Sequence, residues 1–149
     1  MPYRTGGQLD IDEMSRRSLE LVQTIRDGRR EGSLLSVIDF SLTSMGSRLL
    51  ADWLTYPLTD VKQIKTRQDA VENLIARGDA TDDMRLKLRC VCDLERISAK
   101  VVQRRAIPRD LVAINRTLLT LPSIVEFLDQ CSCSLLKTLQ ANLDVLEEL

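Results

Sequence analysis

Apolar residues recur along most of this chain every three or four positions, the spacing that buries one face of a helix. The pattern is clearest over residues 45–54, 61–74 and 111–121. Residues 8–11 and 19–22 are short enough to be strands, and a turn of helix is predicted between them. The spacing therefore predicts an all-α, multi-helix fold, with a small β element near the N-terminus as an open alternative.

Local signals predict where these helices begin and end. Ser33 and Ser44 each precede a helical run and are expected to be N-caps. Pro57 is expected to stop the helix before it, because proline disfavours α geometry in the preceding residue. Pro108 suits a first helical position. Pro122 is expected to end the helix that begins there.

The chain is long enough for one domain with a real core. Its 149 residues are interpreted as a single domain, residues 1–149, of which residues 1–7 are expected to be disordered. Leucines at positions 136, 139, 143 and 146 predict a helix that runs to the last residue. Because this helix has no C-cap, we expect the natural chain to continue beyond it.

Composition and charge narrow the class of protein. The chain is 44% hydrophobic and 29% charged, which is ordinary for a soluble globular protein. Its net charge of −1 gives no overall electrostatic case for nucleic acid or an anionic membrane. No apolar run approaches the roughly 20 residues that a spanning helix needs, and the N-terminus lacks a secretory signal. We therefore expect a cytoplasmic protein with reduced cysteines and no membrane partner.

The usual groups of catalysis are missing. The sequence has no histidine, the commonest general base and metal ligand. It contains no GxxxxGK[ST], GxGxxG or GxSxG motif. The sequence therefore predicts no catalytic residue and no cofactor in this chain, and the chain is not expected to be an enzyme.

Four cysteines form two close pairs, Cys90 with Cys92 and Cys131 with Cys133. Four thiolates could hold zinc, but zinc sites generally space each pair more widely. Cysteine is also one of the residue types most often buried as a small hydrophobe. We favour the buried, structural interpretation over a metal domain.

A basic stripe could contact phosphates. Arg96, Lys100 and Arg104 recur every fourth residue on a predicted helix, which Asp93 is expected to start. Asp93 and Glu95 lie close by, and no aromatic residues interleave to stack on bases. We favour a solvated helix face and keep the phosphate contact as the alternative.

Four further positions suggest structural roles. Glu95 and Arg96 lie between apolar neighbours, so they could form a partly buried pair that locks helices together, or an exposed pair worth little, and we favour the structural pair. Gly46 costs about 1 kcal/mol relative to Ala in a helix, which either a close backbone approach or a loose turn would explain. Trp53 is most simply a core anchor, because aromatic residues are scarce.

Five ordered stretches resemble the core, or lever, domain of the MutS family of DNA mismatch-repair ATPases. They are "IDEMSRRSLEL" (11–21), "SLLSVIDFSLTSMGSRLLADWLTYPLTD" (33–60), "RQDAVENL" (67–74), "DLERI" (93–97) and "RAIPRDL" (105–111). The resemblance covers essentially the whole chain from Gln8. The motif positions to which it gives structural roles are Gly46, Arg48, Trp53, Pro57, Asp93, Glu95, Arg96, Pro108 and Asp110.

The resemblance implies a fold and a role. The fold would be an orthogonal bundle of helices, in which Arg48 ties helices together, and the natural chain would continue at both ends. The role would be a non-catalytic core that couples the ATPase domain to mismatched-DNA binding and clamp movement. The full-length parent would be a DNA-dependent ATPase that binds ATP and magnesium.

The same resemblance implies the partners. They are mismatched double-stranded DNA and the parent's own connector, clamp and ATPase domains, in a parent expected to be dimeric. Ser18, Ser44 and Arg104 depart from the family's pattern. A paralogue acting on other DNA structures therefore stays open, as does a free-standing helical nucleic-acid-binding module.

Overall fold

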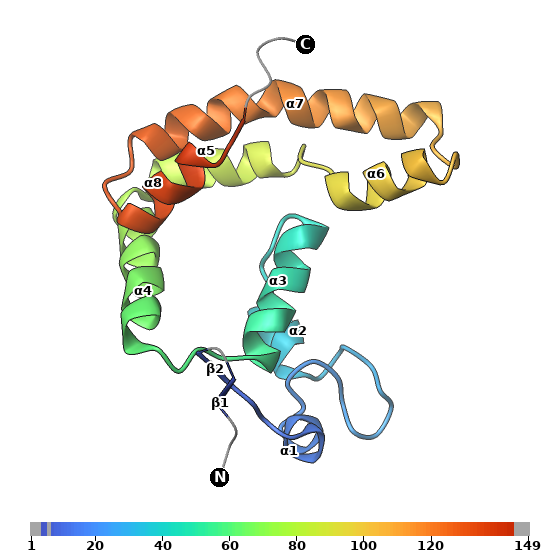
Figure 1. Cartoon of the computed structure of the whole chain (residues 1–149), viewed down its shortest axis with the longest axis vertical. Coiled ribbons are helices and arrows are strands. Elements are labelled where there is room, and N and C mark those ends of the chain that lie inside the picture. Colours follow the sequence, from blue (N-terminus) through green and yellow to red (C-terminus); the bar gives the residue numbers. More distant parts are fainter. Residues whose placement is uncertain (1–3, 6, 145–149) are drawn as a thin grey trace. The chain divides into compact units, whose positions relative to one another are not determined.

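The computed structural model describes residues 4–5 and 7–144, and the chain divides into two compact units, Met1–Ile64 and Lys65–Leu149 (Figure 1). Eight helices and two short strands occur among the described residues, so the all-α prediction and the small β element near the N-terminus are confirmed. Unit 1 contains β1 (Arg4–Thr5), β2 (Gln8–Leu9), α1 (Glu13–Ser18), α2 (Leu34–Ile38) and α3 (Ser44–Thr55). Helix α4 (Val61–Ala76) crosses into unit 2, which holds α5 (Gly78–Leu88), α6 (Leu94–Val102), α7 (Pro108–Asp129) and α8 (Ser134–Ala141).

A small hairpin begins unit 1. Strands β1 and β2 pair antiparallel, and Gly7 supplies the positive φ of 85° near their turn. The backbone after α3 adds to this sheet, since the Leu9 N–H donates to the Pro57 carbonyl at 2.8 Å. Of the residues 1–7 expected to be disordered, 1–3 and 6 lie outside the described residues, whereas Arg4–Thr5 pairs as a strand. The single-domain interpretation of residues 1–149 stays a prediction.

The segment after α1 is irregular rather than a strand. Glu20 has a left-handed φ of 47°, which interrupts the extended backbone that residues 19–22 would need. Its carboxylate accepts a hydrogen bond from the Ile25 N–H at 2.7 Å. Its carbonyl accepts the Leu34 N–H at 3.0 Å and so holds the start of α2.

The helix starts in unit 1 follow the predicted chemistry with one shift. Ser33 caps α2, because its hydroxyl accepts the Ser36 N–H at 3.3 Å. The N-cap of α3 is Thr43 rather than Ser44, since the Thr43 hydroxyl accepts the Gly46 N–H at 3.0 Å. Helix α3 ends at Thr55, as Pro57 predicts.

Unit 2 is organised around α7, which packs against α5, α6 and α8 (Figure 1). Asp93 caps α6 and Pro108 is the first residue of α7, as predicted. The buried core lies where the C-terminal half of α7 meets α4 and α8, and it consists of Ala70, Leu128, Cys131, Cys133 and Leu136.

The prediction that Pro122 ends its helix is wrong. Helix α7 continues through Pro122 to Asp129. A proline inside a helix costs roughly 3 kcal/mol through a lost hydrogen bond and a clash with the preceding turn. Ile124, Phe127 and Leu128 come after the proline, and all three pack in the core of unit 2. Burial of this apolar face offsets the local cost.

Two other expectations about the helices change. The last helix ends at Ala141 with Asn142 as its C-cap, so the leucine row does not continue as helix at Leu143. Residues 145–149, where the rest of that row falls, lie outside the described residues. Helix α7 is long and apolar enough to cross a membrane by length and composition alone, contrary to the sequence expectation. A core helix of a soluble protein passes the same test.

Candidate functional site

The described residues concentrate their specific contacts at the joints between helices. In unit 1 the joint is built on Asp39, whose side chain is only 5% exposed. Its carboxylate accepts hydrogen bonds from the Ser41 N–H at 2.9 Å and from the Ser47 hydroxyl, and it pairs with Arg30. These bonds, led by those from Ser47 and Ser41, hold the pKa of Asp39 well below its usual range. The joint ties the end of α2 to the first turn of α3.

Of the distinctive residues of α3, Gly46 lies beside this joint. A Cβ on Gly46 would lie 3.1 Å from the capping hydroxyl of Thr43 and 3.5 Å from Cβ of Ser41. The glycine therefore admits close side chains, rather than the close backbone approach that was one of the two explanations considered. Arg48 is half-buried on the same helix. Trp53 is 41% exposed, so the prediction of a buried core anchor is wrong for the described structure.

In unit 2 a buried threonine joins α7 to the segment between α5 and α6. Thr117 is 1% exposed, and its hydroxyl accepts the Cys92 N–H at 2.9 Å. The same hydroxyl lies 3.0 Å from the Ala113 carbonyl and 3.1 Å from Sγ of Cys92. This contact could not be predicted from the sequence, because a threonine within a helical run has no signature of a partner 25 residues away.

The four cysteines are free thiols in different surroundings. Cys131 and Cys133 are buried in the core of unit 2, which confirms the structural interpretation for that pair. Cys90 is exposed and Cys92 half-buried, so the buried interpretation is wrong for Cys90. Within residues 4–5 and 7–144, no group of three or more His, Cys, Asp or Glu side chains is arranged to hold a metal ion.

The joint between α6 and α7 centres on Asp110. One carboxylate oxygen accepts the Ile107 N–H at 3.0 Å, and the other lies 2.9 Å from Nζ of Lys100. The bond from Ile107, followed by that from Lys100, lowers the pKa of Asp110. Pro108 precedes it at the first position of the helix. This joint fixes the turn between the two helices.

The basic stripe predicted on α6 is interrupted. The helix ends at Val102, and Arg104 has a left-handed φ of 56°, so Arg104 leaves the helical face. Lys100 is paired with Asp110, and Nε of Arg96 lies 3.8 Å from the Asp93 carboxylate. Glu95 and Arg96 are both exposed, so the favoured interpretation as a partly buried pair is wrong and the exposed alternative describes them.

Helix α4 is joined to the turn between α7 and α8 by Arg77. Its guanidinium lies 5.0 Å from the centre of the Phe127 ring, within the range of a cation–π contact. It also donates to the Gln130 side chain at 2.8 Å. One turn earlier, the Asn73 amide donates to the Ser132 hydroxyl at 2.8 Å. The sequence did not single out these residues, because their partners are more than 50 positions away.

The motif residues therefore belong to two sets rather than one site. Gly46, Arg48, Trp53 and Pro57 lie in unit 1, whereas Asp93, Glu95, Arg96, Pro108 and Asp110 lie in unit 2. Residues 14–149, and with them both sets, match the family model described as MutS domain III. The chain belongs to the MutS family. The recognition made from the five stretches is thereby confirmed.

Several relatives match across almost the whole chain. The DNA mismatch repair protein MutS of Symbiobacterium thermophilum is 42% identical over 147 residues, 99% of this chain. The protein of the same name from Trichodesmium erythraeum is 41% identical over 147 residues. That from Myxococcus xanthus is 42% identical over 144 residues, 97% of this chain. The chain spans only 16–17% of the length of these relatives.

Proposed function

We propose that this chain is the non-catalytic core of a MutS-type mismatch-repair ATPase and couples nucleotide-driven change to DNA engagement. The observation that carries the proposal is that specific side-chain contacts, one of them made by a family motif residue, join the helices. Asp110, for example, holds α6 to α7 through Lys100 and the Ile107 N–H. Contacts of this kind let packed elements move together between two arrangements, as coupling requires.

Helix α7 is suited to carry displacement through unit 2. Its 22 residues span about 33 Å at 1.5 Å per residue. It contacts α6 near its start, and α8 packs against it beside the core. A shift at Pro108 would therefore be passed toward Asp129 by packed side chains.

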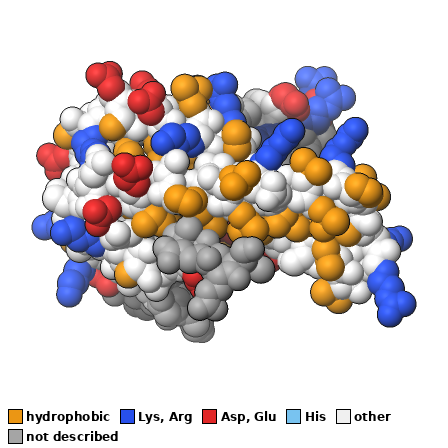
Figure 2. All heavy atoms as spheres, turned by 90° about the horizontal axis from the view of Figure 1, so that it is seen from above, with side chains coloured by type: hydrophobic (Ala, Val, Ile, Leu, Met, Phe, Trp, Pro, Cys, Tyr) orange, Lys and Arg blue, Asp and Glu red, His pale blue; other side chains and the backbone are white. Residues whose placement is uncertain are grey.

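The rest of the parent supplies the chemistry in this proposal. ATP and magnesium would bind in its ATPase domain, and mismatched duplex DNA in other domains of a dimeric, cytoplasmic protein. The connector, clamp and ATPase domains would contact this core. Exposed apolar side chains on α7, namely Leu111 and Leu119, are suited to such contacts. Figure 2 shows hydrophobic side chains gathered along the face seen from above.

A chimera tests the coupling directly. This chain would replace the matching segment of the Symbiobacterium thermophilum protein, with and without Thr117→Val, which removes the hydroxyl joining α7 to residues 90–92. We expect basal ATP hydrolysis and mismatched-duplex affinity to stay within about twofold, because the joint lies outside both sites. The change in hydrolysis caused by mismatched duplex should fall at least about fivefold, the low end of typical coupling factors.

Lys87→Gln, at an exposed position of α5, is the matched control and should keep the full response. A Thr117→Val chimera that responds fully to mismatched duplex would rule out coupling through this joint. Tight, salt-dependent duplex binding by the 149-residue chain alone, lost on replacing Arg96, Lys100 and Arg104, would instead establish the free-standing module.

A further inference from the structure

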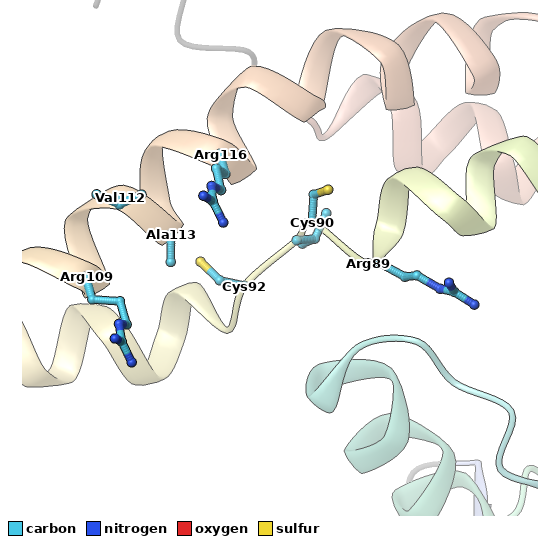
Figure 3. Close-up of a pocket in the computed structure, with 8 residues that line it drawn as sticks. Arg89, Cys90, Cys92, Arg109, Val112, Ala113 and Arg116 are labelled. Carbon is cyan, nitrogen blue, oxygen red and sulfur yellow. The ribbon is translucent and has the colours of Figure 1, made fainter.

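A cavity of about 650 Å³ lies within unit 2, between the segment that joins α5 to α6 and the first turns of α7 (Figure 3). Three arginines line it, Arg89, Arg109 and Arg116, together with the thiols of Cys90 and Cys92. None of its lining residues is acidic. We refer to this cavity as the arginine groove.

The α7 side of the arginine groove follows from helical spacing. Residues 109, 112, 113 and 116 recur at intervals of three, one and three, so they share one face of α7. Val112 and Ala113 form an apolar floor, with an arginine at each end, about 10 Å apart along the helix axis. In Figure 3 Arg116 points toward the segment that carries Cys90 and Cys92, whereas Arg89 points away.

The positive charge of the arginine groove is not neutralised within the described structure. Among residues 7–144, none of the guanidinium groups of Arg89, Arg109 and Arg116 has an ion-pair or hydrogen-bond partner. The neighbouring carboxylate of Asp110 is occupied by Lys100 and the Ile107 N–H. Clustered cations with no acid among them raise the local concentration of anions.

We propose that the arginine groove binds a compact anion that carries phosphate groups. Guanidinium is planar and presents paired donors that match phosphate oxygens. The cavity volume lies within the range of about 300–1,000 Å³ typical of small-molecule sites. The apolar floor over Val112 and Ala113 suits the less polar part of such a ligand. The phosphate could belong to a free small molecule or to a DNA strand, and both have the same recognition chemistry.

Cys90 provides a reporter inside the arginine groove. It is exposed, whereas Cys131 and Cys133 are buried, so a neutral alkylating reagent can be followed at each thiol by peptide mapping. Inorganic pyrophosphate is the first probe, added to the full chain with sodium chloride controls of equal ionic strength, because salt alone screens the arginines. We expect saturating pyrophosphate to slow alkylation of Cys90 at least about threefold, with calorimetry giving the affinity.

The variant Arg109→Gln/Arg116→Gln should weaken pyrophosphate binding at least about tenfold, since each charge-assisted bond is worth that factor or more. Both side chains are exposed, so the fold should survive, and circular dichroism checks it. The matched control, Lys87→Gln/Arg105→Gln, removes the same charge from exposed positions outside the groove and should bind as the original chain does.

A short single-stranded oligonucleotide separates the two sources of phosphate. Protection of Cys90 by pyrophosphate but not by the oligonucleotide identifies a small-molecule site, and protection by the oligonucleotide, with or without protection by pyrophosphate, identifies a DNA strand. Either result supports the arginine groove if the Arg109→Gln/Arg116→Gln variant removes the protection. Protection that persists in this variant, or no protection by either probe, overturns the proposal. Neither result bears on the Thr117→Val chimera, so the two proposals fail separately.

Discussion

Each of the two units is stabilised internally by a different kind of interaction. Unit 1 relies on a polar joint, in which the nearly buried Asp39 carboxylate gathers Arg30, Ser41 and Ser47. Unit 2 has an apolar core in which Leu128 and Leu136 pack with other buried side chains from three segments. A polar network needs every partner in place, whereas an apolar core accepts many volume-conserving exchanges.

This difference explains why one stretch is so recognisable. Residues 33–60, the longest of the five family-like stretches, contain Asp39, Ser41 and Ser47 of the polar joint of unit 1 and the close approach at Gly46. A side chain that must donate or accept a hydrogen bond at a fixed position can be replaced by few other residue types. The leucine-rich helices of unit 2 follow a pattern that many helical proteins share. In this chain the distinctive stretch therefore corresponds to hydrogen-bonded polar side chains, and the periodic leucine pattern corresponds to apolar packing.

The largest loss of stability is expected from a substitution in the apolar core of unit 2. Leu136→Ala should lower the free energy of unfolding by about 3 kcal/mol, because it removes a buried side chain and leaves a cavity. Urea unfolding followed by circular dichroism measures the change. Leu139→Ala on the same helix is the matched control: that side chain is 49% exposed, so its loss should be below about 1 kcal/mol. Equal losses for the two variants would contradict an apolar core at α8.

The second largest loss of stability is expected from a substitution in the polar joint of unit 1. Asp39→Ala removes the carboxylate that accepts hydrogen bonds from several donors. It should lower the free energy of unfolding by about 2 kcal/mol. Trp53, the only tryptophan in the sequence, lies in unit 1 and reports its unfolding by fluorescence. Asp52→Ala, at an exposed carboxylate of α3, is the control and should stay within about 0.5 kcal/mol.

The contribution of Asp39 to the free energy of unfolding should depend on pH. The pKa of Asp39 is lower in the folded state than its unfolded value of about 3.9, so its contribution is complete above that value. As the pH falls below about 4, the unfolded state takes up the proton first and the contribution is lost. The difference between the original chain and Asp39→Ala should therefore shrink from pH 5 toward pH 2. A constant difference would mean that the variant acts through packing rather than charge.

The sequence predicted what depends on neighbours along the chain. The N-caps Ser33 and Asp93 bond to N–H groups three residues ahead, and Pro57 acts on the residues just before it. The shift from Ser44 to Thr43 changes one residue within the same local rule. Signals confined to one turn of chain need no knowledge of the fold.

The joints could not be predicted because their partners are distant. Arg77 meets Gln130 and Cys131 across more than 50 positions, and Thr117 meets Cys92 across 25. Each of these residue types is ordinary at its own position, and only tertiary packing selects the partner. The basic stripe, for which phosphate contact was the alternative interpretation, assumed a helix through Arg104, whereas α6 ends at Val102. The uncompensated arginines lie on α7 and beside Cys90 instead.

Pro122 shows where packing overrides a local rule, and it gives the smallest prediction. If burial of the apolar face of α7 keeps the helix intact at the proline, Pro122→Ala should raise the free energy of unfolding by about 1 kcal/mol. The restored helical hydrogen bond outweighs the added conformational freedom of the unfolded chain. Pro108→Ala is the matched control, because a proline at the first helical position breaks no bond, and it should not stabilise. A loss of stability in Pro122→Ala would mean that α7 needs the bend a proline imposes in order to reach α8, and that the core of unit 2 depends on a specific local geometry as unit 1 does.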